Sequence, residues 1–170
     1  LQKHIDELKW LYCELYQDNP SVMMHLNDLI AEMKKYYHSR SSALKASDCR
    51  READPNWYKR NDLLGMMMYA NAFGKTLKGV EETMDYIKEC NVNYLHLMPL
   101  LSSPRGKSDE GYAVADFRQV QEELGTMDDF ANMTEKCHEN GISVCLDFVM
   151  NHTSDEHAWA KRAKEGQKEY

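Results

Sequence analysis

Three short apolar runs constrain the fold of this chain more than any other feature. They lie at residues 65–70, 92–97 and 142–149, and each has the length of a strand rather than a helix. Between them, apolar residues at helical spacing predict one helix that runs to about Cys90. Another helix opens with a capping box at Thr126 and ends before Gly141. Apolar strands that alternate with helices predict an α/β fold whose parallel sheet is covered on both faces.

The first 54 residues have a different pattern, which predicts helices alone. Apolar residues recur at helical spacing on both sides of a turn at Asp18, Asn19 and Pro20, and a third, shorter helix is expected over 42–52. The Met and Tyr stripes of this segment are typical of a hydrophobic core rather than of a cofactor site. We therefore expect a helical domain at 1–54 and an α/β domain at 55–170.

Composition excludes several classes of partner. Asp and Glu total 28 against 21 Lys and Arg, and the resulting net charge of −7 argues against nucleic acid or an anionic membrane as the main partner. The sequence has no run of 18 apolar residues, so we expect no membrane span. The first residues lack the pattern of a secretory leader, and we expect a cytoplasmic piece of a longer protein. The five scattered cysteines form no CxxC pair, which favours free thiols over disulfides or zinc.

Two short motifs resemble known ligand sites but lack a required feature. Gly74, Lys75 and Thr76 follow a predicted strand as in a phosphate-binding loop, yet Tyr69 occupies the position where that motif needs its first glycine. His152 and His157 lie near two carboxylates, but a spacing of five residues does not place both imidazoles on one helical face. We interpret this second stretch as solvated loop charges, and we expect no metal and no cofactor.

A long connection and an acidic strand indicate a site at the carboxyl end of the sheet. Residues 99–125 contain no clear long element, whereas connections in α/β units usually have about two to six residues. The third strand carries Asp147 and ends on Asn151 and His152. Binding sites form at the carboxyl ends of parallel strands, so His152 is expected to contact a ligand. Asp147 and Asn151 share one strand face, where a hydrogen-bonded, structural role is expected for Asp147.

Three stretches resemble the α-amylase family of glycoside hydrolases and transglucosidases. Residues 147–152, DFVMNH, are similar to the Asp-x-x-x-Asn-His signature that closes the third barrel strand of that family. Residues 94–100, YLHLMPL, resemble its second strand, and residues 106–114, GKSDEGYAV, resemble the following loop of amylosucrases and related sucrose-cleaving enzymes. The helical leader is similar to the domain that precedes the barrel in amylosucrase. The resemblance therefore covers nearly the whole chain.

The resemblance implies a fold and a set of roles. The fold is the N-terminal part, about three β/α units, of a (β/α)8 barrel preceded by a helical segment. His152 would hydrogen-bond a hydroxyl of the transferred glucosyl unit, and Tyr112 would stack on the apolar face of that sugar. Asp109 would pair with an arginine elsewhere in the protein and close the pocket behind one glucose. Asn151 matches a calcium-liganding position of many α-amylases, but amylosucrases generally lack that calcium, so none is expected.

The resemblance also implies that the reacting groups lie outside this chain. Retaining glycosidases need two carboxylates about 5 Å apart, one nucleophile and one acid/base. In the family these follow the fourth and fifth strands, so they are expected beyond Tyr170, and no residue here is assigned a catalytic role. We expect the chain alone to be inactive. Three parallel strands leave an open edge, which predicts self-association or marginal folding.

Three functions remain open on the sequence. The first is an amylosucrase-like enzyme that cleaves sucrose and passes glucose to an α-glucan acceptor or to water. The second is a general α-amylase-family hydrolase, such as an α-glucosidase or a trehalose-forming relative, acting on another α-glucoside. The third is a non-catalytic α/β interaction module with a helical arm.

Overall fold

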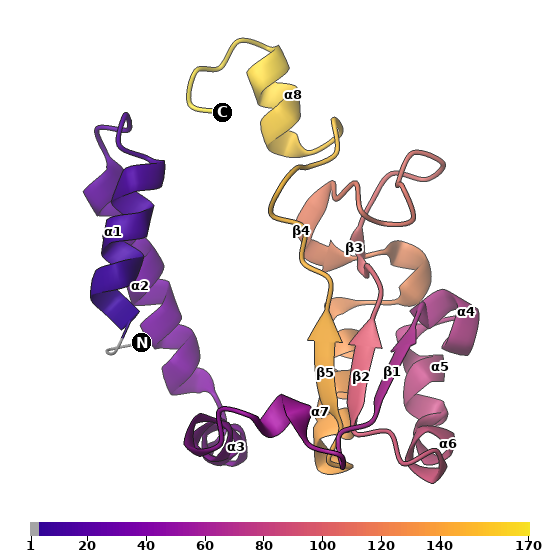
Figure 1. The fold of residues 1–170 in the computed structure, drawn as a ribbon. Helices are drawn as coiled ribbons and strands as arrows, with labels where there is room; N and C mark the ends of the chain where they lie inside the picture. Colours follow the sequence, from indigo (N-terminus) through magenta and orange to yellow (C-terminus); the bar gives the residue numbers. More distant parts are fainter. Residues whose placement is uncertain (1–3) are drawn as a thin grey trace. The chain divides into compact units, whose positions relative to one another are not determined.

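The computed structural model describes residues 4–170, which form two compact units (Figure 1). The first unit ends at Trp57 and the second begins at Tyr58, close to the boundary expected after residue 54. The first unit is helical, and the second contains all the described strands.

The helical unit contains the three helices that the sequence predicts. They are α1 (Ile5–Leu15), α2 (Val22–Ser39) and α3 (Ser42–Ala53). The prediction that the Met and Tyr stripes form a core is wrong here, because the side chains of Met23 and Tyr37 are 52% and 57% exposed. Leu26 and Ile30 of α2 are the buried apolar residues among those described in this unit. Two helices packed side by side bury one narrow stripe, and the remaining apolar positions face outward.

A parallel sheet forms the centre of the second unit, as the alternation of strands and helices predicts. Its strands, in spatial order, are β1 (Gly65–Met68), β2 (Tyr94–Leu97) and β5 (Ser143–Leu146). The register places Met67 beside His96, and His96 beside Cys145. Each strand is shorter than its apolar run. In particular, β5 ends at Leu146, so the prediction that Asp147 and Asn151 share a face of a continuing strand is wrong.

Helices cover one face of this sheet, and the prediction of two covered faces is wrong for the described residues (Figure 1). Along β2, Leu95 and Leu97 are fully buried, whereas Tyr94 and His96 are half-buried. Met67 of β1 is 66% exposed on the same side as His96. Successive strand residues point to opposite faces, so this burial pattern separates a helix-packed face from an open face.

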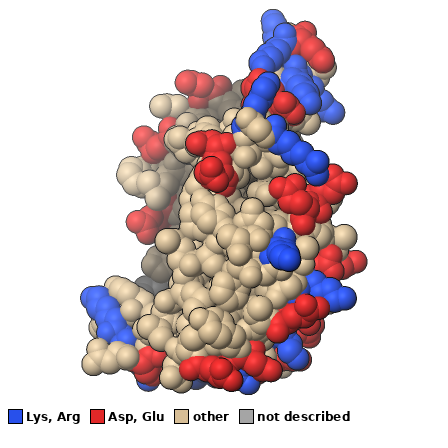
Figure 2. All heavy atoms as spheres, turned by 90° about the vertical axis from the view of Figure 1, so that its right-hand side faces the viewer, with Lys and Arg blue, Asp and Glu red and all other residues tan. Residues whose placement is uncertain are grey.

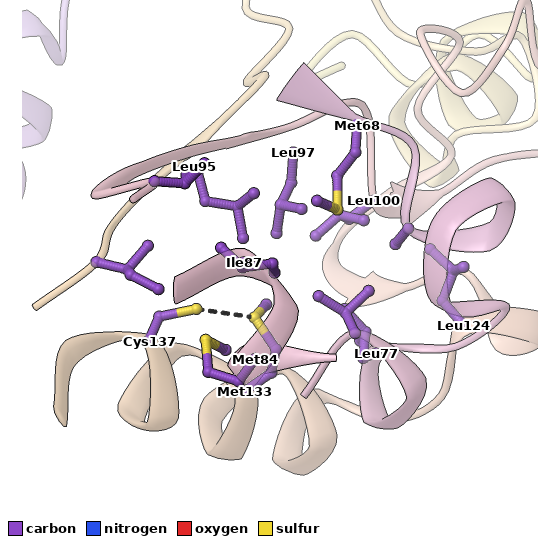
Figure 3. Packing of buried hydrophobic residues seen from close by; sticks show 14 of the residues in the cluster. Met68, Leu77, Met84, Ile87, Leu95, Leu97, Leu100, Leu124, Met133 and Cys137 are labelled. Atoms are coloured by element: carbon purple, nitrogen blue, oxygen red, sulfur yellow. Dashed lines mark hydrogen bonds between the residues drawn. The ribbon is translucent and has the colours of Figure 1, made fainter. Parts of the chain in front are cut away.

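The hydrophobic core lies between the packed face of the sheet and the helices (Figure 3). Leu95 and Leu97 meet Leu77, Ile87 and Met133 from the helical layer, and all of these side chains are fully buried. Cys137 lies in the same layer, where its thiol contacts the sulfur of Met133 at 3.6 Å. Burial raises the pKa of the Cys137 thiol to about 11, so this cysteine remains protonated at neutral pH. All five cysteines are free in the described chain, as expected.

The segment between β1 and β2 is more broken than the single predicted helix. It contains α4 (Ala70–Gly74), α5 (Leu77–Glu82) and α6 (Met84–Glu89), and α5 and α6 meet at Thr83. Lys75 adopts a φ of 66° between α4 and α5. A Cβ on Gly74 would lie 2.3 Å from the backbone nitrogen of Val80, so glycine is required for this close approach. The glycine of the apparent phosphate loop thus serves helix packing.

The long connection after β2 contains elements that the sequence pattern does not reveal. It forms an antiparallel pair, β3 (Leu101–Ser102) and β4 (Asp116–Val120), followed by the short helix η3 (Glu122–Leu124). The next helix, α7 (Met127–Glu139), begins with the predicted capping box between Thr126 and Asp129. Gly141 follows α7 with a φ of 73°, which confirms the predicted helix end. The described elements finish with α8 (Ala158–Lys164).

Charged side chains of both signs are mixed on the surface. On the face shown in Figure 2, acidic and basic groups lie interspersed around a broad uncharged area. This distribution resembles a solvated protein surface more than the basic stripe that nucleic acid requires. Within residues 4–170, no helix has the length and apolar character needed to cross a membrane.

Candidate functional site

Three side chains meet at the carboxyl end of the sheet through one carboxylate. Asp147 follows β5 directly, and its Oδ1 lies 3.0 Å from Nε2 of His96 on the neighbouring strand β2. The phenol of Tyr112, from the long connection, donates a hydrogen bond of 2.9 Å to Oδ2 of the same carboxylate. Asp147, at the end of an apolar strand, therefore has hydrogen-bond partners on both carboxylate oxygens, and these offset the cost of its desolvation.

The electrostatics of this cluster favour a neutral Tyr112. Its hydrogen bond to Asp147 raises the pKa of the phenol, because ionisation would remove the donated proton and place two negative charges together. Partial burial and the nearby Tyr69 and Asp109 act in the same direction. Tyr112 thus acts as a hydrogen-bond donor throughout the neutral pH range.

A strained turn positions Tyr112. Its backbone N–H donates to the carbonyl of Asp109 at 3.0 Å, and both Asp109 and Glu110 adopt left-handed backbone conformations, with φ values of 48° and 55°. Gly111 has a φ of 96°, and a Cβ there would lie 2.8 Å from the Cβ of Pro99. Left-handed backbone is costly for residues other than glycine and recurs at functional sites. The turn therefore holds the backbone end of Tyr112 firmly against the end of β2.

Asp109 lies beside Tyr112 but outside the hydrogen-bonded cluster. Its side chain is exposed, and it influences Tyr112 through charge rather than through a direct contact. A small cavity of about 110 Å³ opens next to this turn, lined among others by Tyr69, Asn71 and Glu110. The resemblance places the arginine partner of Asp109 elsewhere in the protein, so the pairing of Asp109 with an arginine stays a prediction.

His152 and Asn151 are exposed, and Nδ1 of His152 lies 3.2 Å from the amide nitrogen of Asn151. Their segment runs beside that of Tyr112, because the N–H of Ser154 donates to the carbonyl of Val114 at 2.8 Å. His152 lines a groove of about 620 Å³ together with Phe117, Phe148 and other residues. Tyr112 does not line that groove. The structure therefore brings Tyr112 to Asp147, while His152 occupies a neighbouring apolar groove.

The interpretation of this stretch as solvated loop charges is confirmed for the exposed Asp155 and Glu156 but is wrong for His157. The side chain of His157 is 7% exposed, packs edge-on against Trp159 and contacts the ring of Phe117. Its Nδ1 accepts a hydrogen bond of 3.1 Å from the backbone of Trp159 and so caps α8. Among residues 4–170, no group of three or more His, Cys, Asp or Glu side chains is placed to hold a metal ion. His157 is a structural residue.

His96 is the member of the cluster that the sequence analysis missed. It stands in the middle of an apolar strand, where a histidine is most simply interpreted as a core residue. The alternation along this strand could have revealed its role, because Leu95 and Leu97 point to one face of the sheet and His96 points to the other. Two strands with polar residues on one face predict a polar contact across that face.

Comparison with known proteins gives the family. Residues 16–170 match the family model described as "Alpha amylase, catalytic domain". This chain belongs to the α-amylase family. The catalytic domain of this family is a TIM barrel, and the described part of the chain supplies its N-terminal helices and parallel strands as an open sheet. The open face of the sheet is therefore the face that turns toward the interior of such a barrel.

Several relatives match about two thirds of this chain. The chain is 36% identical over 122 residues to the salivary alpha-glucosidase of Anopheles gambiae and 40% identical over 116 residues to the trehalose synthase/amylase TreS of Mycolicibacterium smegmatis. These matches cover 68% and 65% of this chain. The chain spans about a fifth of the length of these relatives, which are covered to 20% and 19%.

Solved structures agree with this assignment. The trehalose-6-phosphate hydrolase TreA of Bacillus licheniformis is 36% identical, with a TM-score of 0.61, over 66% of this chain and 21% of that protein. The MutB E254Q mutant in complex with the substrate sucrose is 31% identical, with a TM-score of 0.56, over 59% of this chain and 19% of that protein. The α-amylase-family relatives are thus enzymes of sugar chemistry, which favours the two enzymatic interpretations over an interaction module.

Proposed function

We propose that the whole protein cleaves an α-glucosidic bond and that sucrose is its substrate, as in amylosucrase-like enzymes. The reaction proceeds with retention, through a covalent glucosyl intermediate on a carboxylate supplied by the rest of the barrel. The glucosyl unit then passes to an α-glucan or to water. This chain contributes the binding wall of the pocket and none of the reacting carboxylates.

The proposed roles follow from the chemistry of each side chain. Tyr112 offers an aromatic face to the apolar face of one glucose, and its phenol remains protonated because Asp147 accepts its proton. Asp109 closes the pocket by pairing with an arginine, so that one glucosyl unit fits and an open glucan cleft does not form. His152 hydrogen-bonds a sugar hydroxyl through its imidazole.

The observation that supports this proposal most is the anchored Tyr112. Its ring is fixed at the backbone by the turn at Asp109 and at the phenol by Asp147, on the sheet end that carries binding sites in TIM barrels. The loop that contains Asp109 supports a sucrose substrate by its resemblance to sucrose-cleaving enzymes. The likeness to MutB, solved with the substrate sucrose, gives independent support.

A second candidate is hydrolysis of other α-glucosides. It is favoured by the relatives themselves, which include alpha-glucosidases and an oligo-1,6-glucosidase of Parageobacillus thermoglucosidasius that is 42% identical over 83 residues. The second-unit residues described here are compatible with both substrates, because both present one terminal glucosyl unit.

Product analysis on the whole protein separates the candidates. The protein is incubated in turn with sucrose, maltose, isomaltose and trehalose, and the released sugars are measured by anion-exchange chromatography. Fructose released from sucrose, with little cleavage of the other three, is the expected result. Faster cleavage of maltose or isomaltose would replace sucrose with the second candidate. No cleavage of any of the four would contradict the enzymatic proposal.

A further inference from the structure

We propose that Asp147 is a positioning residue that fixes the ring of Tyr112 for sugar stacking and is itself fixed by His96. The inference deepens the proposed function and rests on it, because the sugar is the ligand that Tyr112 would bind. It assigns a role to His96 and Asp147 through Tyr112, without contact between either of them and the substrate.

The geometry of the carboxylate carries the inference. His96, Tyr112 and Asp147 come from β2, from the long connection and from the end of β5, so the contact joins three separate segments. An ionised carboxylate only accepts hydrogen bonds, and each of its oxygens here faces one donor. His96 therefore presents its Nε2 proton to Oδ1, which leaves Oδ2 oriented toward the phenol.

Tyr112 is held at both ends. The turn that contains Asp109 fixes its backbone, and Gly111 packs against Pro99 too closely for any larger residue. The hydrogen bond from the phenol fixes the far end of the ring. Restraint at both ends fixes the position and the long axis of the ring, and a prepositioned ring lowers the cost of ordering a stacking surface when a ligand binds.

Position argues against a purely structural role for the carboxylate. The side chains of His96 and Asp147 are 32% and 25% exposed, and they lie on the open face of the sheet rather than in the helix-packed core. In a complete TIM barrel this face turns inward, so the carboxylate lies among groups that can line a pocket rather than in the packed core. Orientation of Tyr112 is a function that this place and these partners explain.

Kinetics of the whole protein test the positioning role. Asp147→Asn keeps the size of the side chain but replaces one carboxylate oxygen with an amide N–H₂. That group cannot accept a hydrogen bond from either His96 or Tyr112. We expect kcat/KM for the preferred α-glucoside to fall roughly 10- to 100-fold, since small displacements of positioning groups have effects of this size. KM should change more than kcat, because stacking binds ground state and transition state alike. The matched control Asp128→Asn, an exposed carboxylate on α7, should leave both constants unchanged.

A double variant distinguishes positioning from direct contact. Tyr112→Phe keeps the ring and removes the hydroxyl that Asp147 accepts from. If Asp147 acts through that hydroxyl, the double variant Asp147→Asn with Tyr112→Phe should be no worse than Asp147→Asn alone. Fully additive losses would overturn the inference, because they would mean that Asp147 acts on the sugar independently of Tyr112.

Two variants of His96 test whether its N–H donor is what positions Asp147. His96→Gln retains an N–H donor, and His96→Leu removes it. We expect the glutamine variant to keep kcat/KM within a few-fold of the wild type and the leucine variant to fall toward Asp147→Asn. Equal losses in the two variants would contradict the role given to His96.

A titration separates failure of this inference from failure of the proposed function. The ionisation of Tyr112 is followed by NMR in protein labelled at the tyrosine ring carbons, with Tyr112→Phe used for assignment and no substrate present. The pKa of Tyr112 should fall toward its ordinary value in Asp147→Asn and stay raised in Asp128→Asn. An unchanged pKa would overturn the contact itself, whereas inactivity of the wild type on every α-glucoside would overturn only the proposed function.

Discussion

The two faces of the β1–β2–β5 sheet differ in what their side chains do. On the helix-packed face, Leu95 and Leu97 are fully buried beneath α5, α6 and α7. On the open face, His96 alternates with these leucines and joins Asp147 in the hydrogen-bonded cluster. Strand geometry produces the difference, because neighbouring residues point in opposite directions. One strand thus supplies both the core and the candidate site.

This comparison explains how the chain tolerates polar groups in an apolar strand. The helix-packed face contributes stability through burial of apolar area, at about 25 cal/mol per Å². The open face contributes hydrogen-bonding groups that a pocket can use, and in a complete TIM barrel it points inward. The predictions below separate the two contributions.

Truncation on the packed face should have the largest effect on stability. Leu97→Ala removes a fully buried side chain from the centre of the core, and we expect a loss of about 2–5 kcal/mol in the free energy of unfolding. In the 170-residue chain studied alone, Met67→Ala on the open face is the control, because Met67 is 66% exposed there. Urea-induced unfolding followed by circular dichroism measures both. Comparable losses for the two variants would contradict the division between the faces.

Alanine in the turn before Tyr112 should have the next largest effect. Gly111→Ala forces a Cβ against Pro99 in a left-handed backbone, and we expect a loss of about 1–3 kcal/mol. Gly106→Ala is a matched control, because Gly106 has a φ of 72° but no atom within 4 Å of a new Cβ. The difference between the two variants, measured by thermal unfolding, isolates the contact with Pro99. An equal effect at both positions would show that the contact does not matter.

Loss of the capping box should weaken the helical layer moderately. Thr126→Ala removes the hydroxyl that accepts the N–H of Asp129 at 3.1 Å, and we expect a loss of about 1 kcal/mol. Thr134→Ala in the middle of α7, whose hydroxyl donates to the carbonyl of Ala131 within its own helix, is the control. Hydrogen exchange of the first turn of α7 should increase in the capping variant alone.

The contact on the open face should make stability depend on alkaline pH. Because the pKa of Tyr112 is raised in the folded protein above its unfolded value of 10.0, the stabilisation is fully present below about pH 10. It is lost as the pH rises through the raised pKa. The free energy of unfolding should therefore decrease more steeply above pH 10 in the wild type than in Tyr112→Phe. Parallel curves for the two proteins would contradict the hydrogen bond to Asp147.

The parts of the fold that follow from local patterns were predictable. The three helices of the first unit, the parallel sheet and the capping box at Thr126 depend on periodicity and capping chemistry, which the sequence displays directly. The antiparallel pair β3–β4 was not predictable, because β3 has two residues and no alternation to detect. The exposure of Met33 was missed because periodicity identifies an apolar stripe without identifying what covers it.

Part of the candidate site was likewise predictable from the sequence, and part of it was not. The resemblance selected Asp109 and Tyr112, and the acidic strand end selected Asp147; the structure places all three at one end of the sheet. His96 was missed because its partner Asp147 is 51 residues away and belongs to another strand. The register of two strands decides that contact, and register depends on packing of the whole unit rather than on local sequence. The sugar-binding role of His152 stays a prediction.

A crystal structure of the whole protein with glucose bound in its barrel tests the central claim most directly. We expect a glucose ring stacked on the face of Tyr112, with the phenol still donating to Asp147 and with His96 on the other carboxylate oxygen. Glucose bound in the barrel without contact to Tyr112, or Tyr112 rotated away from Asp147, would contradict it.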